Sequence, residues 1–251
     1  MLFASGFSWF HLIPGVEDGS LFPFAHDHGY IFASAWFACL IVIGFALMAR
    51  AGLNRALARQ GAERYAPESK LSAFVAAEAL IGALRNLMLE QMDVKYVRTY
   101  LPLVVGLFIY IFTCNILAVF PGFQPPTDNI NANAGMATMV FIAFMAAGLL
   151  SDPVGFIKHL MGPVLFMAPM MFVIEAIGLI VRPVSLSIRL TGNMFGDHTV
   201  FNIMSDLVPL GVPIAFLALA TLVSVIQAGV FSLLTIIYIS LSLPHGDHDH
   251  H

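Results

Sequence analysis

Long apolar stretches alternate with short polar connections along this chain. A helix needs about 20 consecutive apolar residues to cross the hydrocarbon core of a bilayer. Residues 30–49, 100–120 and 131–150 meet this length without a charged side chain. The pattern therefore predicts three simple membrane-spanning helices.

Two further apolar segments are too long for a simple crossing. Residues 160–204 are mostly apolar, and residues 207–243 carry no charge. As helices they would be roughly 65 and 55 Å long at 1.5 Å per residue, against a hydrocarbon core of about 30 Å. Each segment is therefore broken or steeply tilted. We favour two long tilted helices packed as an antiparallel hairpin over residues 160–243. Three prolines offer kinks or helix starts: Pro183, Pro209 and Pro213.

Residues 69–95 show a different pattern, in which apolar residues recur at helical spacing and charged residues fall between them. This predicts an amphipathic helix at the interface or against other helices, and not a span. The apolar positions are Leu71, Phe74, Val75, Ala77, Leu80, Ile81, Leu84 and Met88. The charged positions are Glu78, Arg85, Glu90 and Asp93.

The composition agrees with a membrane protein. Of the 251 residues, 59% are hydrophobic and only 10% are charged, whereas soluble domains carry about 25% charged residues. We therefore predict an all-α polytopic membrane protein, a single transmembrane domain over 1–251 with five crossings and one amphipathic helix. The net charge of −4 offers no basic surface to nucleic acid. Cys39 and Cys114 lie in apolar spans and form no metal motif.

Lysine and arginine placement predicts the orientation, because cytoplasmic loops carry an excess of both. Eight of the eleven lie between the first and second spans, so residues 50–99 form a cytoplasmic loop. The segment 1–29 carries neither and is external, as is the loop 121–134, which we expect to be irregular. With five crossings, the tail 244–251 is cytoplasmic.

Ionisable residues interrupt the segment 160–204. Inside a membrane such residues are functional candidates by default, because burying a charge is costly. Glu175, Arg182 and Arg189 are spaced seven apart and share nearly one helix face. Arg189 has no acid within four positions. It therefore snorkels, pairs with an acid from another helix, or serves a function through its charge.

A polar stripe surrounds Arg189. Ser185, Arg189 and Asn193 are spaced four apart, and Gly192 and Gly196 form a GxxxG pair. Such a pair lets another helix approach closely. The arrangement predicts a hydrated cavity, or a surface against which a second transmembrane element slides.

Each of the other polar residues in this segment has two possible roles. Glu175 either pairs with Arg182 or lines a proton path, and Arg182 also suits snorkelling at the interface. Asp197 and His198 form either a hydrogen-bonded interfacial pair or a proton relay, since histidine titrates near physiological pH.

Two amides stand in apolar helices. Gln227 is the amide of an uncharged 37-residue stretch, 207–243, and Asn115 lies in the second span. Each either forms an interhelical hydrogen bond or belongs to the functional site. For Gln227 the second reading means contact with the Arg189 region.

Three motifs resemble one family, subunit a of the F-type ATP synthase. The stretch RPVSLSIRLTGNMFGDH, 182–198, resembles its hallmark, IQAGVFSLLTIIYISL, 226–241, its final helix, and PTDNINANAGMA, 126–137, its external segment. The resemblance covers most of the chain from about Tyr100 onward. It places the essential arginine of the family on Arg189.

The resemblance assigns further roles. It places the asparagine associated with the arginine on Asn193, the final-helix glutamine on Gln227, the preceding acid on Glu175 and the outer-channel ionisable group on His198. Many members carry a second ionisable group on the last helix, where this chain has the neutral Ala220. The outer proton relay must therefore differ, and Asp197, Thr221, Ser224 or water are the candidates.

The resemblance implies a proton-translocating stator subunit with two aqueous half-channels. A rotor ring carries carboxylates that cross lipid only when neutral, and Arg189 supplies the counter-charge where they ionise. The partners implied are the rotor c-ring, the b-type subunits of the peripheral stalk, other ATP synthase subunits and lipid. The location implied is the bacterial inner membrane. No cofactor, metal or bond chemistry is expected in this chain.

Two rival functions remain open at the level of sequence. A secondary transporter for an organic anion would use Arg189 to bind substrate, but such proteins usually show internal repeats. A haem or quinone subunit of a respiratory complex would need two histidines at matching depth for bis-histidine ligation, and only His198 lies well inside an apolar segment.

Overall fold

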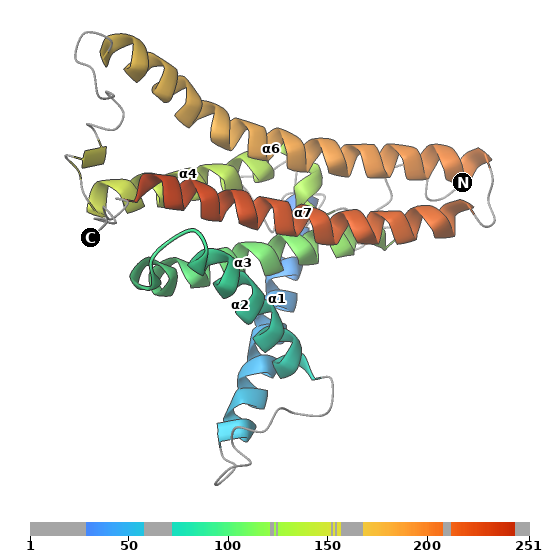
Figure 1. Ribbon diagram of the computed structural model, residues 1–251. Coiled ribbons are helices and arrows are strands. Elements are labelled where there is room, and N and C mark those ends of the chain that lie inside the picture. Colours follow the sequence, from blue (N-terminus) through green and yellow to red (C-terminus); the bar gives the residue numbers. More distant parts are fainter. Residues whose placement is uncertain are drawn as a thin grey trace.

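The computed structural model describes residues 29–57, 72–120, 123, 125–151, 153, 155, 156, 168–207 and 212–243. Within these residues the chain is helical and contains no strand, which confirms the predicted all-α class (Figure 1). The elements are α1 (Gly29–Leu57), α2 (Ala73–Leu89), α3 (Val94–Val119), the short 3₁₀ helix η3 (Pro126–Asp128), α4 (Ile130–Ser151), α6 (Ala168–Leu207) and α7 (Val212–Ser242).

Five of the described helices are long and apolar enough to cross a membrane. The candidate spans are Ile31–Arg55, Val94–Val119, Ile130–Ser151, Met170–Phe201 and Ala215–Ser242. The predicted polytopic fold with five crossing helices is therefore confirmed by helix length and composition.

The amphipathic helix predicted within 69–95 is α2, which is shorter than that range. Ser72 caps its N-terminus by accepting a hydrogen bond from the amide of Val75. Ala77, Leu84 and Met88 are buried on one face, and the charged residues predicted to face elsewhere are exposed. The helix packs on α1 and α3.

The second span begins earlier than residue 100. The backbone is extended at Asp93 and turns helical at Val94, so the last residues of the predicted amphipathic segment belong to α3. The first turn of α3 buries Val97 and exposes Lys95 and Arg98. Hydropathy alone missed this start because the charged Lys95 and Arg98 interrupt the apolar pattern there.

The external loop predicted at 121–134 is more ordered than expected. Residues 126–128 form η3, and α4 begins at Ile130. The side chain of Asn129 accepts a hydrogen bond from the amide of Asn131, which satisfies one of the free N–H groups at the start of the helix.

The last two helices form the predicted antiparallel hairpin (Figure 1). Pro183 lies inside α6 without ending it, and Pro213 lies in the first turn of α7, where proline is tolerated. The helices lie side by side near their connection and separate toward the N-terminal end of α6 (Figure 1). There, consecutive apolar residues from Met170 to Ile174 are all exposed. The stretch 160–167 and Pro209 lie outside the described residues.

Four helices meet in the principal core. Leu107 and Ile111 of α3 pack with residues of α4, α6 and α7, which include Leu190. The remaining members are Ala137, Val140, Leu186, Ala228 and Phe231. Burial of Leu186 and Leu190 fixes one face of α6 against the bundle, and Arg189 lies between these two positions.

The crossing of α1 and α2 depends on a glycine. A Cβ atom built at Gly52 would lie 2.5 Å from the Cβ of Phe74, a distance that real side chains do not reach. A glycine at this position therefore lets the two helices approach closely.

Candidate functional site

Arg189 projects away from the helical bundle. Its neighbours Leu186 and Leu190 are 2% and 1% exposed, whereas Arg189 itself is exposed. Within the part of the chain that the structure describes, its guanidinium has no hydrogen bond or ion pair. The cation is thus presented to whatever lies beside α6.

The face of α6 next to Arg189 is open. A Cβ atom built at Gly192 or Gly196 meets no atom within 4 Å. Ile188 and Phe195 on the same side are 58% and 66% exposed. The GxxxG pair predicted to admit a neighbouring helix is therefore not covered by any described helix of this chain.

Asn193 connects this region to the last helix. Its side-chain nitrogen donates a hydrogen bond to Oε1 of Gln227 at 2.6 Å, and Gln227 is 5% exposed. Gln227 thus makes an interhelical hydrogen bond, and its partner lies on the turn of α6 that follows Arg189.

A second amide, missed by the sequence analysis, holds α6 from the other side. Asn133 of α4 is fully buried and donates hydrogen bonds of 2.7 Å to both the hydroxyl of Thr191 and the carbonyl of Thr127. The asparagines at and just before the start of α4 were the available signal. Spacing alone did not tell which of them faces the bundle.

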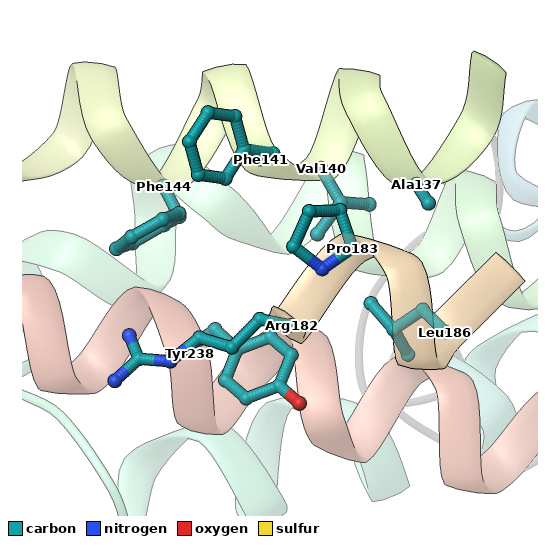
Figure 2. A pocket seen from close by; sticks show the side chains of 8 residues that line it. All are labelled: Ala137, Val140, Phe141, Phe144, Arg182, Pro183, Leu186 and Tyr238. Carbon is teal, nitrogen blue, oxygen red and sulfur yellow. The ribbon is translucent and has the colours of Figure 1, made fainter. Parts of the chain in front are cut away.

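Arg182 joins three helices (Figure 2). Its Nη2 lies 3.4 Å from Oε1 of Glu175, so these two residues form an ion pair along α6. Its Cζ lies 5.6 Å from the ring centroid of Phe144 on α4 and 5.4 Å from that of Tyr238 on α7. A guanidinium between aromatic faces gains about 0.5–2 kcal/mol per contact, depending on burial.

A small pocket lies beside Arg182, between α4, α6 and α7 (Figure 2). Pro183 and Leu186 form its α6 wall, and its lining is almost wholly apolar.

The remaining predicted residues are spread along α6 and α3. Ser185 and Asp197 are half-buried on α6, and Asn115 is 4% exposed on α3. His198 lies in α6, but its side chain is outside the described part of the structure. The structure brings Asn193 and Gln227 together, and Glu175 and Arg182 together, but leaves Arg189 without a partner from the described residues.

Several buried oxygen atoms have no hydrogen-bond partner among the described residues. They belong to Asn115, Thr127, Asn133, Ser187 and Ser232. Buried polar atoms are nearly always paired with protein or water. Asn133 and Thr127 are joined directly, and Ser187 precedes Thr191 by one turn, so polar atoms gather where η3, α4 and α6 meet.

Comparison with known proteins gives a consistent result. The model of the family described as ATP synthase A chain matches residues 32–240. A protein of Bdellovibrio bacteriovorus named ATP synthase subunit a is 35% identical over 96% of this chain and 99% of its own length. ATP synthase subunit a of Geobacter sp. (strain M21) is 39% identical over 82% of this chain and 86% of its own length. ATP synthase subunit a 1 of Pelobacter propionicus is 45% identical over 66% of this chain and 72% of its own length.

Proposed function

Because the chain belongs to the family of ATP synthase subunit a, we propose that it forms two aqueous half-channels that load and unload the carboxylates of a rotor ring. Family membership makes it the proton-translocating subunit of the membrane sector, a multi-pass membrane protein that works with other ATP synthase subunits. It also favours this function over the two rivals, an anion transporter and a haem or quinone subunit.

The observation that carries the proposal is the exposed, unpaired Arg189 beside an open helix face. A charge in the membrane needs a counter-charge, a hydrogen-bonding partner or water, and the described residues give Arg189 none. A rotor carboxylate supplies the counter-charge. At about 4 Å and an effective dielectric constant of about 20, the attraction is about 4 kcal/mol. Arginine stays charged throughout, so it cannot relay the proton and instead separates the two half-channels.

The rotor ring fits the open surface at Gly192 and Gly196. Small residues let backbones of neighbouring membrane helices approach closely, and a Cβ atom built at either position meets no other described part of this chain within 4 Å. A ring that turns against this surface meets Arg189 once for each carboxylate that passes.

The outer half-channel runs past Asp197 and His198 toward the buried side-chain oxygen of Asn115. Buried oxygens that lack a protein partner are typically hydrated, and hydration is what proton entry requires. The inner half-channel runs past Ser185, Glu175 and Arg182, where the ion pair is part-buried, with side-chain exposures of 35% for Glu175 and 23% for Arg182.

Ala220 leaves the last helix without the ionisable group found in many relatives. Two nearby hydroxyls, of Thr221 and Ser224, donate to carbonyls of their own helix at 2.8 and 2.7 Å. Their oxygens then stay free to accept hydrogen bonds from water. We assign the relay function on this side to Asp197 and His198, with these hydroxyls as acceptors.

The same proposal includes the membrane, the orientation and the neighbouring subunits of the chain. We assign it to the bacterial inner membrane with the N-terminus periplasmic and the C-terminus cytoplasmic, since lysine and arginine concentrate between the first two spans. The rotor c-ring and the b-type subunits of the peripheral stalk are its expected neighbours in the membrane sector.

Substitution of Arg189 tests the proposal. In purified complex reconstituted into vesicles, Arg189→Ala should abolish proton-driven ATP synthesis while the complex still assembles. Arg189→Lys should fail largely as well, because a buried lysine loses its proton readily. Thr138→Val is the control, since Thr138 is exposed on α4 and its hydroxyl bonds only its own helix. Normal synthesis by the Arg189→Ala complex would overturn the proposal.

A further inference from the structure

We propose that Asn133 is a positioning residue for Arg189, because its hydrogen bond to Thr191 sets the rotation of α6 about its own axis. The inference rests on the proposed function of Arg189. It concerns a different residue, on a different helix, which touches neither the arginine nor the open face.

Thr191 and Arg189 point in opposite directions from α6. At 3.6 residues per turn, two positions along a helix are separated by roughly 200°. A contact that draws Thr191 toward α4 therefore turns Arg189 away from α4. Asn193 lies only roughly 40° from Arg189 by the same geometry, and its bond to Gln227 holds that side toward α7.

These two hydrogen bonds fix the rotation of α6 about its axis, which the apolar contacts do not fix. Leu186, Leu190 and Met194 bury one face of α6, but apolar contact is non-directional and tolerates small rotations of a helix. The bonds from Asn133 and to Gln227 are directional, and they join α6 to two different helices within one turn of Arg189. The arginine has no partner of its own among the described residues, so its direction depends on these neighbours.

In the hydrogen bond between Asn133 and Thr191, the donor and the acceptor cannot exchange roles. The side-chain nitrogen of Asn133 uses both of its hydrogens, one for the carbonyl of Thr127 and one for the hydroxyl of Thr191. The hydroxyl of Thr191 donates its own hydrogen to the carbonyl of Ser187 at 3.0 Å. Thr191 is therefore the acceptor, and a hydroxyl at this position is required while its methyl group is not.

Asn133 also joins α6 to the segment before α4. Thr127 is fully buried in η3, and its carbonyl is the second acceptor of the Asn133 amide. One side chain thus holds η3, α4 and α6 in fixed relation. A residue that only filled space would not need a nitrogen with two donated hydrogens.

The matched variants are Thr191→Val, which removes the acceptor at nearly constant volume, and Thr191→Ser, which keeps it. Asn133→Leu removes the donor in a side chain of similar size.

Proton-driven synthesis is measured per assembled complex in reconstituted vesicles, so that lower assembly does not count as lower activity. We expect Thr191→Val and Asn133→Leu to lower the rate about tenfold, less than the about 100-fold that a 1 Å misplacement of a catalytic group can cost. Thr191→Ser should keep the wild-type rate, because it keeps the acceptor hydroxyl.

A second measurement reports the rotation of α6 directly. In a background that carries Cys39→Ser and Cys114→Ser, the substitutions Asn193→Cys and Gln227→Cys are joined with a short bifunctional thiol reagent. The yield of this link should fall when Thr191→Val is added and recover with Thr191→Ser. A substitution that only weakened packing would lower assembly without this difference between valine and serine.

The outcomes separate this inference from the proposed function. If Arg189→Ala keeps its synthesis rate, the proposed function fails. If Arg189→Ala is inactive while Thr191→Val and Asn133→Leu both match the wild type, only the positioning role fails. Equal loss in Thr191→Val and Thr191→Ser would also overturn it. Should one of the two apolar variants not assemble, the other decides.

Discussion

The side-chain nitrogen of Asn193 lies 2.6 Å from Oε1 of Gln227, and this hydrogen bond joins α6 to α7 one turn beyond Arg189. The two residues are 34 positions apart in sequence. Gln227 is almost fully buried, so losing its partner leaves a polar group without compensation.

This relationship predicts non-additive effects of substitution. Asn193→Leu alone should destabilise the chain by about 1–3 kcal/mol, because it leaves the buried amide of Gln227 unsatisfied. Gln227→Leu alone should cost less, because the amide that it leaves behind, Asn193, is exposed. The double substitution should cost less than the sum, as expected for residues in direct contact. Thermal unfolding of the purified complex in detergent measures this, and additive losses would contradict the contact.

The contacts of Arg182 predict a difference between two substitutions of Tyr238. Tyr238→Phe keeps the aromatic face 5.4 Å from the guanidinium and should leave stability nearly unchanged. Tyr238→Leu removes that face and should cost about 0.5–2 kcal/mol beyond any loss of packing. In an Arg182→Leu background the difference between the two variants should shrink by this amount, and only the loss of packing should remain. An unchanged difference there would show that the ring acts without the cation.

Two glycines of α1 should respond in opposite ways to the same substitution. At Gly44 a new Cβ meets no atom within 4 Å, so Gly44→Ala should stabilise the helix by up to about 1 kcal/mol. At Gly52 the Cβ would collide with Phe74, so Gly52→Ala should destabilise by about 1–3 kcal/mol. Unfolding temperatures of the two variants compare them directly, and equal shifts would argue against the close crossing of α1 and α2.

Substitution at Gly192 should separate folding from function. A Cβ atom there meets no other described part of this chain within 4 Å, so we expect Gly192→Leu to leave the stability of the isolated subunit unchanged or higher. In the complete complex it should block close approach of the rotor and lower ATP synthesis at least tenfold, an order of magnitude that corresponds to about 1.4 kcal/mol. Full activity of the assembled variant would place the rotor elsewhere.

The proton relay assigned to His198 predicts a change in pH dependence. Histidine titrates between about pH 5 and 8, so His198→Ala should flatten the pH profile of proton flow in this range more than it lowers the maximal rate. Passive proton flux through the membrane sector in vesicles provides the measurement. An unchanged profile would exclude His198 from the path.

The sequence by itself determined the number and place of the crossing helices. Apolarity over about 20 residues is a property of each segment alone, because the bilayer is the solvent that selects it. The same reasoning singled out Arg189 and Glu175, since a charge inside an apolar stretch is visible without any knowledge of its neighbours. Hydropathy placed the start of α3 too late, because Lys95 and Arg98 interrupt the apolar pattern there, while Val97 packs on protein.

Only the tertiary structure decided which polar groups meet. Three asparagines precede or begin α4, and Asn133 alone among them is buried, against a threonine 58 positions away. The pairing of Asn193 with Gln227 and the open space at Gly192 likewise depend on how far each helix is rotated and shifted against its neighbours. Those two quantities are set jointly by side chains on several helices, and no single segment of the sequence contains them.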